Sequence, residues 1–346
     1  MKTFTCGGCG QPVYFESVRC VKCDRALAFL PGPRTMAALE PAEAPGTFRA
    51  VGIKGDERWR FCQNSVEHGV CNWAVPAKED EPFCVACRLN HVIPDLSDAR
   101  AKDDWHRIEL AKRRLLFSLL GLGLPVESKR VDPARGLAFD FLKAGDGNPV
   151  FTGHSDGLIT INIAEAEDPF REQARERLGE RYRTMLGHFR HESGHYYWDR
   201  LVDGSPRLEA YRELFGDERA SYDDARKKHY DSGGAPNWWE TFVSAYASMH
   251  PWEDWAETWA HYLHMFDGLQ TARSHGLSLV AAKTALDSRG LDLRDFDDLI
   301  AGWVPLTVAL NDLNRSFGMA DAYPFVLTDA VVAKLRFVHD TIAASR

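Results

Sequence analysis

The pentapeptide His191-Glu192-Ser193-Gly194-His195 contains the residue types of a zinc hydrolase at the required spacing. On a helix the two imidazoles lie one turn apart on one face, so both can bind one zinc ion while Glu192 accepts a proton from a water there. The alternative is a surface helix with an ordinary histidine pair, because composition alone produces such a pentapeptide in about three such chains per hundred. Gly194 argues against that alternative, since glycine within a helix costs about 1 kcal/mol.

A catalytic zinc needs a third protein ligand and an open fourth position for water. The sequence PWEDWAETWAHYLH, which begins at Pro251, offers two carboxylates. Proline suits the first turn of a helix, so Glu253 and Glu257 should lie one turn apart on a common face. One can bind the metal while the other accepts the remaining ring N–H of a ligating histidine. These residues alone do not decide which glutamate is the ligand, and both could be ordinary charges on a helix.

All eight cysteines lie within the first 87 residues. They form two sets, Cys6/Cys9 with Cys20/Cys23, and Cys62/Cys71 with Cys84/Cys87. Each set can build a tetrahedral four-thiolate zinc site, and His68 or His91 could replace a cysteine in the second set. Disulfides are not expected because the first residues contain no signal peptide. We therefore expect two structural zinc ions rather than redox-active cysteine pairs.

Composition and charge narrow the choice of partner. The chain has 346 residues, 45% hydrophobic and 27% charged, and this length allows two domains. A net charge of -8 argues against nucleic acid or an anionic membrane. Residues 1–96 contain 11 Lys+Arg and 11 Asp+Glu, which favours a docking, substrate-presenting or scaffolding role over DNA binding. The most apolar run, LLFSLLGLGL at 115–124, is shorter than the roughly 20 residues that span a bilayer, so we expect a cytoplasmic protein.

The elements that must position these residues form two predicted domains. Residues 1–96 are expected to be a zinc-ribbon module in which the Pro/Ala/Gly-rich residues 31–48 connect the two cysteine sets. Residues 97–346 are expected to be mainly helical. Their first helix should be capped by Asp103, with Arg113 and Arg114 on its exposed side.

The rest of the second domain should contain a small sheet and several helices. Strands are predicted at 136–142 and 158–163, and one helix should run from Phe170 through the His191 region. Its core side would carry Leu178, Tyr182, Met185 and Phe189. Further helices are expected near 206–229, 236–248, 251–266 and 329–344. The predicted fold class is therefore α+β.

Taken together, these motifs resemble a known group of enzymes. HExxH followed by Tyr246-x6-Glu253-x3-Glu257 resembles the gluzincin metallopeptidases of the lethal-factor type. The whole layout is similar to bacterial zinc-binding metallopeptidases with an N-terminal zinc ribbon, through the cysteine pattern, CNW at 71–73, WHRIELAKRRLL, FRHESGHYYW and PWEDWAETWAHYLH. The resemblance implies a zincin-like domain with His191, His195 and Glu253 as zinc ligands. It also implies Glu192 as general base, Tyr246 as hydrogen-bond donor to the oxyanion, and Glu257 as the carboxylate that orients a ligand.

The expected function is zinc-dependent hydrolysis of a peptide bond in a peptide or protein, with Glu192 activating the water. The strand at 158–163 could offer an edge to which an extended substrate adds. Five nearby tryptophans are expected to pack around the metal helices rather than to form a ligand-binding box: Trp238, Trp239, Trp252, Trp255 and Trp259. The nearby histidines His250, His261 and His264 are expected to be structural or substrate-side groups. Two alternatives remain, a zinc-stabilised interaction protein with an inactive peptidase-like domain and a zinc hydrolase of small amides.

Overall fold

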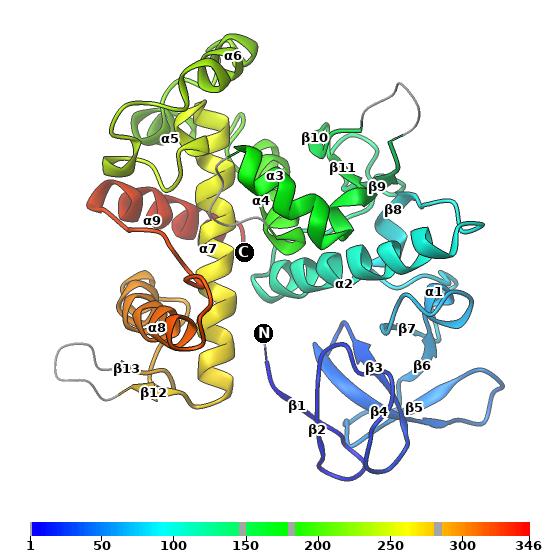
Figure 1. Ribbon diagram of the computed structural model, residues 1–346. Coiled ribbons are helices and arrows are strands. Elements are labelled where there is room, and N and C mark those ends of the chain that lie inside the picture. The colour runs from blue at the N-terminus through cyan, green and yellow to red at the C-terminus, as the bar shows by residue number, and fades with distance from the viewer. Residues whose placement is uncertain (1, 145–149, 179–183, 280–285) are drawn as a thin grey trace.

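The computed structural model describes residues 2–144, 150–178, 184–279 and 286–346. It is an α+β structure in which the long helix α7 (Pro251–Ser274) runs through the middle of the molecule (Figure 1). One side of α7 carries α5 (Leu208–Phe215), α6 (Tyr222–Ser232), α8 (Phe296–Ser316) and α9 (Asp329–Ala344). The other side carries α2 (Ala99–Gly121), α3 (Asp168–Leu178), α4 (Met185–Leu201) and a small sheet. The strand-rich N-terminal region lies below α2 in this view.

The N-terminal region is built from short antiparallel strands. Strand β1 (Phe4–Thr5) pairs with β2 (Pro12–Val13) beside the first cysteine set. A five-stranded sheet follows in sequence order, β3 (Ala26–Leu30), β4 (Thr35–Pro41), β5 (Phe48–Val51), β6 (Arg58–Phe61) and β7 (Ala74–Pro76). The sheet curls, because the backbone N–H of Phe29 in β3 donates to the carbonyl oxygen of Asn72, just before β7.

The prediction that residues 31–48 only connect the two cysteine sets was wrong, because β4 lies within them. Met36 and Ala38 belong to the main apolar core, whereas Ala37 and Leu39 belong to a second cluster on the opposite face. A strand that is buried on both faces shows no alternation of apolar and polar residues, so its sequence gives little sign of a strand.

Helix α2 confirms the predicted helix but differs in two details. The Asp98 carboxylate accepts the backbone N–H of Arg100, so Asp98 is the N-cap instead of Asp103. Arg113 is buried and donates to the carbonyl oxygen of Val70, and Arg114 Nε donates to Glu16 at 2.8 Å. The expectation of a solvated side chain was wrong for Arg113, because the N-terminal region packs on that side of the helix, while the side chain of Arg114 is 40% exposed.

The small sheet has the strand order β10-β11-β9-β8. Its strands are β8 (Asn90–Val92), β9 (Ala138–Leu142), β10 (Gly153–Ser155) and β11 (Leu158–Asn162), which confirms both predicted strands. However, β11 pairs with β9 on one side and β10 on the other, so it has no free edge for a substrate. The edge strands of this sheet are β10 and β8.

Several short elements complete the chain. These are α1 (Gln63–Val66), η1 (Cys87–Leu89), η2 (Ile163–Ala166), η3 (Trp238–Glu240), η4 (Tyr246–Ser248), β12 (Ser278–Leu279) and β13 (Leu286–Asp287). The predicted helix at 236–248 is therefore wrong, because η3 and η4 are single 3-10 turns. Asn237 adopts a left-handed backbone with φ of 57°, which a continuing helix cannot accommodate.

The prediction of one helix from Phe170 through the His191 region is also wrong, because two helices, α3 and α4, take its place. Helix α4 begins after Thr184, whose extended backbone and hydroxyl, which accepts the N–H of Gly187, form an N-cap. Met185 and Phe189 of α4 are buried as expected. Tyr182 and the side chain of Leu178 lie outside the described part of the chain.

One apolar core joins the N-terminal region to the helices. It extends from Phe4 to Ile342 and includes residues of the N-terminal sheet, of α2 and of the C-terminal helices. Phe117 of α2 lies edge-on to Phe4, Phe15 and Phe29, with ring centroids 5.4–6.3 Å apart. The N-terminal region therefore packs onto α2 as part of the same core.

Candidate functional site

Both cysteine sets form compact clusters of sulfur atoms. The two sets are Cys6, Cys9, Cys20 and Cys23, and Cys62, Cys71, Cys84 and Cys87. Sulfur pairs lie 3.6 Å apart in the first cluster and 3.7 Å apart in the second, close to the roughly 3.8 Å expected when tetrahedral Zn–S bonds measure about 2.3 Å. A disulfide would bring the atoms to about 2.05 Å. The eight thiols thus fit two closed zinc sites.

The second cluster also receives hydrogen bonds from the backbone. The N–H of Trp73 donates to Cys71 Sγ at 3.3 Å, and the N–H of Cys84 donates to Cys62 Sγ at 3.4 Å. Such bonds stabilise thiolates and fix their orientation. Neither histidine that could have replaced a cysteine joins the four sulfurs: the His68 ring packs against Trp105, and His91 pairs with Asp140.

A third group of candidate metal ligands forms where α4 meets the start of α7. The Nε2 atoms of His191 and His195 lie 3.0 and 3.5 Å from Glu253 Oε2. The donor atoms of these three residues all lie within 4.8 Å of one another. Among the described residues, Glu253 Oε2 is buried without a hydrogen-bond partner. Two imidazoles and a carboxylate facing one point match the ligand set of a catalytic zinc.

Glycine at position 194 allows the two ligand-bearing helices to come this close. A Cβ atom at Gly194 would lie 2.8 Å from Ala256 Cα and 3.2 Å from Trp259 Cβ, both on α7. Real Cβ contacts essentially never fall below 3.0 Å, so any side chain here would push α4 and α7 apart. The glycine that weakens α4 as a helix therefore brings the histidines of α4 within reach of Glu253.

The two glutamates of α7 face different nitrogens of His191. Glu257 Oε1 accepts the Nδ1–H of His191 at 2.7 Å, while Glu253 lies on the Nε2 side. The other oxygen of Glu257 accepts the hydroxyl of Ser244 at 2.7 Å. Ser244 was not anticipated from the sequence, because nothing in its neighbourhood marks it as part of the site.

Two tyrosines and Glu192 surround the same point. Glu192 is buried, and within the described chain its Oε2 has no hydrogen-bond partner. The Tyr246 ring lies 5.9 Å from the His191 ring. Tyr222 of α6 donates its hydroxyl proton to Glu253 Oε1 at 2.8 Å. Sequence reasoning missed Tyr222, because no spacing motif links it to a glutamate 31 positions away.

Burial and charge shift the pKa values in opposite directions at this site. Burial raises the pKa of Glu192 above its ordinary value of 4.5, and the charges of His191 and His195 oppose this only in part. Burial alone would lower the pKa of His191, but the adjacent carboxylates of Glu253 and Glu257 raise it well above 6.5. A raised pKa suits Glu192 to accepting a proton near neutral pH. Zinc binding at His191 would release a proton.

The neighbouring aromatic and histidine residues mostly support the ligand helices. Trp255 and Trp259 are fully buried and donate their indole N–H groups to the carbonyl oxygen of Gly194 and to Ser193 Oγ. The Trp252 ring packs on His195, with centroids 3.9 Å apart. Trp239, in contrast, is 55% exposed, so the expectation of core packing was wrong for this residue.

The three histidines near α7 also make structural contacts. His250 is the N-cap of α7, because its Nδ1 accepts the N–H of Trp252. His261 is buried, with its Nδ1 2.7 Å from the Tyr323 hydroxyl. The ring of His264 packs edge-on against Trp303.

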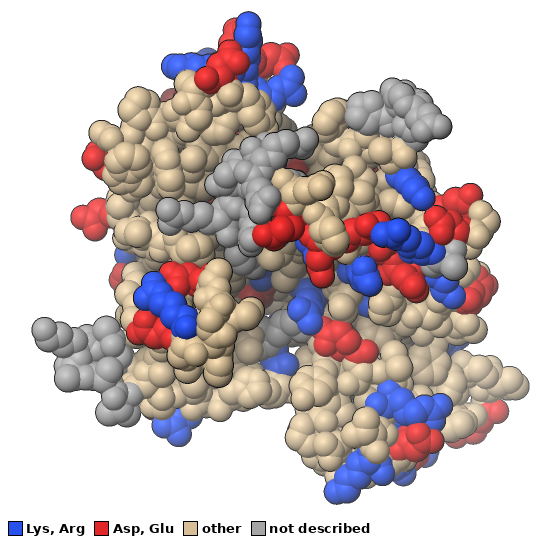
Figure 2. All heavy atoms as spheres, in the orientation of Figure 1, with Lys and Arg blue, Asp and Glu red and all other residues tan. Residues whose placement is uncertain are grey.

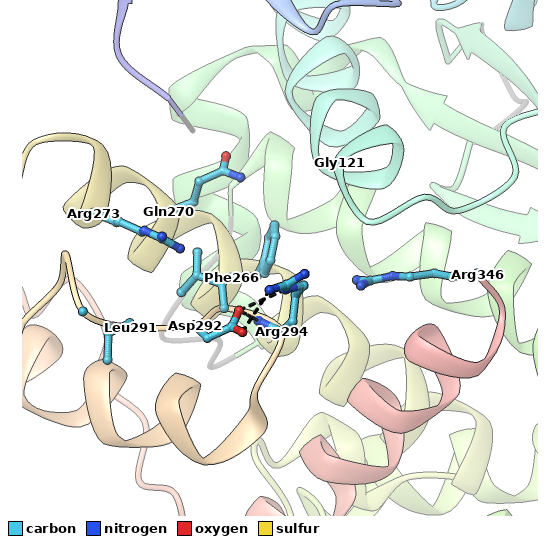
Figure 3. A pocket seen from close by; sticks show the side chains of 10 residues that line it. Gly121, Phe266, Gln270, Arg273, Leu291, Asp292, Arg294 and Arg346 are labelled. Atoms are coloured by element: carbon cyan, nitrogen blue, oxygen red, sulfur yellow. Dashed lines mark hydrogen bonds and ion pairs between the residues drawn. The ribbon is translucent and has the colours of Figure 1, made fainter.

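A cavity of about 550 Å³ lies at the opposite end of α7 from His191, His195 and Glu253. Arg273, Arg294 and Arg346 extend into it (Figure 3), and Arg294 pairs with Asp292. Arg346 Nε donates to the carbonyl oxygen of Leu122 at the end of α2. Because helix C-termini carry partial negative charge, basic residues here are balanced by the ends of α2 and α7. We assign this cavity no part in the metal chemistry.

The visible surface is mixed in charge. Acidic and basic side chains are interspersed over the face shown in Figure 2, without a large area of one sign. In the described part of the chain, no helix is both long enough and apolar enough to cross a membrane.

Comparisons with known proteins identify the family of the chain. A family model described as "Putative zinc-binding metallo-peptidase" matches residues 101–341, and a zinc-ribbon domain model matches residues 3–98. An uncharacterized protein of Mycobacterium bovis and two of Mycobacterium tuberculosis are each 42% identical to this chain over 343 residues, covering 99% of it and 95% of the relative. No solved structure gives a significant match. Because the peptidase model spans most of the residues that build and surround the His/Glu site, the chain belongs to this zinc-binding metallo-peptidase family and carries an N-terminal zinc-ribbon domain.

Proposed function

We propose that the chain hydrolyses peptide bonds, with His191, His195 and Glu253 holding a catalytic zinc ion. The observation that carries this proposal is the convergence of these three donor groups beside a buried carboxylate, Glu192, whose Oε2 has no hydrogen-bond partner in the described chain. Zinc bound there would polarise the substrate carbonyl and lower the pKa of a water molecule. The two cysteine clusters would hold structural zinc.

The residues around the zinc ligands would have three further roles: proton transfer, oxyanion stabilisation and orientation of a ligand. Glu192 would take the proton from the attacking water and pass it to the departing amine. Tyr246, beside His191, would donate a hydrogen bond to the oxyanion, a contact worth about 2.7–4 kcal/mol in the barrier. Glu257 would hold the His191 ring through Nδ1, which directs Nε2 towards the zinc.

Strand β10 is the best placed element to hold an extended substrate. It is one of the two edge strands of the small sheet, and the His154 ring of β10 lies 6.3 Å from the His195 ring. A peptide that adds to this edge would gain backbone hydrogen bonds next to the metal ligands. This arrangement supports a peptide or protein as substrate. A docking role for the zinc-ribbon domain and a cytoplasmic location stay predictions.

The experiment is to compare wild type with Glu192→Gln on a mixture of unstructured peptides, following cleavage by mass spectrometry. The substitution removes the base while keeping the shape, so we expect cleavage to fall by a factor of about 10²–10⁴ with zinc content unchanged. Glu213→Gln, at an exposed position of α5, is the charge-matched control and should cleave normally. If Glu192→Gln cleaved like wild type, the base assignment would be wrong. A wild type that binds three zinc ions but cleaves no peptide would favour an interaction protein.

A further inference from the structure

Helix α6 is an unusual neighbour for a buried metal site, because none of its residues is fully buried. Asp223, Asp224, Arg226, Lys227 and Lys228 are exposed. Tyr222 and His229, two turns apart on one face, are half-buried. A helix with so little apolar surface gains little stability from packing. Its inward contacts are therefore concentrated in these two rings.

Both rings of α6 point at groups of the proposed active site. Tyr222 lies edge-on to His250 and Trp252, with centroids 5.4 and 6.3 Å away, and Trp252 in turn packs on His195. His229 lies edge-on to Tyr246 at 5.7 Å. Helix α6 thus contacts a proposed ligand, a residue stacked on a ligand, and the proposed oxyanion donor.

The two oxygens of the Glu253 carboxylate have different partners. Oε2 faces the Nε2 atoms of His191 and His195, at 3.0 and 3.5 Å. Oε1 accepts the hydroxyl of Tyr222 at 2.8 Å. Because a carboxylate can rotate and exchange its oxygens, a hydrogen bond to Oε1 fixes which oxygen is presented to the metal.

The start of α6 is itself tied to the start of α7. His250 accepts the N–H of Trp252 through Nδ1, so its Nε2 carries the proton and donates to the carbonyl oxygen of Ala220 at 3.1 Å. Ala220 directly precedes Ser221, the N-cap of α6. One histidine therefore joins the two helix starts, and this connection places the Tyr222 hydroxyl over Glu253.

We propose that Tyr222 is a positioning residue of the metal centre, which holds Glu253 so that Oε2 faces the zinc. The inference rests on the proposed function, in that Glu253 must be a zinc ligand. Partners of this kind change metal affinity or activity by about 10–100-fold when removed. Tyr222 acts through Glu253, whereas Tyr246 would act on the reacting carbonyl.

The test measures zinc affinity at the third site by competition with a chelator too weak to strip the four-cysteine sites. Tyr222→Phe should raise the zinc dissociation constant by about 10–100-fold while two zinc ions per chain stay bound at the cysteines. Tyr230→Phe is the matched control, because Tyr230 lies on the same helix but is 58% exposed. It should bind zinc like wild type.

Two further variants separate the possible failures. Glu253→Gln should weaken zinc binding more than Tyr222→Phe does; if it leaves zinc binding unchanged, the proposed ligand set and the role of Tyr222 are both overturned. If Glu253→Gln weakens binding but Tyr222→Phe does not, only the role of Tyr222 is overturned. Should Tyr222→Phe fold poorly, the same comparison is made with Tyr222→Leu, which should weaken zinc binding at least as much.

The kcat at saturating zinc is a second readout. It separates weaker metal binding, which added zinc corrects, from a general disturbance of the structure, which added zinc does not correct. Saturating zinc should restore the kcat of Tyr222→Phe, because the defect is in holding the metal. It should not restore the kcat of Tyr246→Phe. A kcat of Tyr222→Phe that stays low at saturating zinc would contradict positioning through Glu253.

Discussion

The cysteine clusters and the His/Glu site offer metal ligands in contrasting surroundings. Each cysteine cluster brings four sulfurs to one point, and no histidine or carboxylate joins them among the described residues. In the described part of the chain, the His/Glu site brings together three donors, and Glu192, Tyr222, Tyr246 and Glu257 surround them. Four thiolates saturate a tetrahedral zinc ion, while three ligands leave a position open for water. The same metal is thus expected to stabilise structure at two sites and to react at the third.

The two kinds of site also differ in their links to the core. All four cysteines of the second cluster are buried, and Arg113 and Trp105 of α2 contact its surroundings through Val70 and His68. The His/Glu site lies on two helices that already pack closely through Trp255 and Trp259. Loss of a cysteine should therefore disturb the fold, whereas loss of a histidine should mainly disturb the chemistry.

The largest effect is expected from Cys84→Ser in the second cluster. The substitution removes a thiolate from a fully buried site, so we expect loss of its zinc ion and a fall of about 4 kcal/mol or more in the free energy of unfolding. Denaturant unfolding followed by circular dichroism, with elemental analysis of zinc, measures both quantities. Cys9→Ser is the matched control, because Cys9 lies in the less buried first cluster. It should also lose one zinc ion but cost less stability. Equal losses for the two variants would contradict the difference in burial.

A smaller effect on stability is expected from the double variant His191→Ala/His195→Ala. Elemental analysis should show a fall from about three zinc ions per chain to about two. Stability that the third zinc contributes by mass action is lost, which is about 2.7 kcal/mol when free zinc exceeds the dissociation constant 100-fold. Circular dichroism should still show a folded helical protein.

The control for this variant is His68→Ala/His91→Ala, which removes two histidines that do not join the cysteine clusters. It should keep all three zinc ions. If the His191/His195 variant kept three as well, the third ion would lie elsewhere and the proposed centre would be wrong.

The sequence predicted those elements whose pattern is local. The apolar residues of α2 recur at helical spacing, and its Trp105, Ile108, Leu115 and Leu119 are all fully buried. Strand β4 escaped prediction because both of its faces are buried, and α8 because Pro305 lies within the helix and interrupts the usual signals. Arg113 was misplaced because its burial depends on a neighbour from a distant part of the chain.

The candidate site likewise contains residues that local sequence spacing predicts and residues that it does not. The motif His191-Glu192-x-x-His195 is one helical turn, so its geometry follows from spacing alone. The choice of Glu253 over Glu257 rested on the family resemblance, and the structure places Glu253 beside both Nε2 atoms. Tyr222 and Ser244 reach the site only through the paths of α6 and of the loop before α7, and sequence spacing does not predict such paths.

The smallest effect on stability is expected from Gly194→Ala. Two opposing contributions to the free energy of unfolding must be compared here. Alanine favours a helix over glycine by about 1 kcal/mol, but a Cβ 2.8 Å from Ala256 Cα overpacks the helix interface at a cost of about 1–3 kcal/mol. Backbone atoms of α7 cannot rotate away, so we expect the cost to prevail, with a lower unfolding temperature and weaker zinc binding at the third site. Gly32→Ala is the control, since a Cβ there meets nothing within 4 Å. If Gly194→Ala instead stabilised the protein and left zinc affinity unchanged, the close approach of α4 and α7 would not be what brings the ligands together.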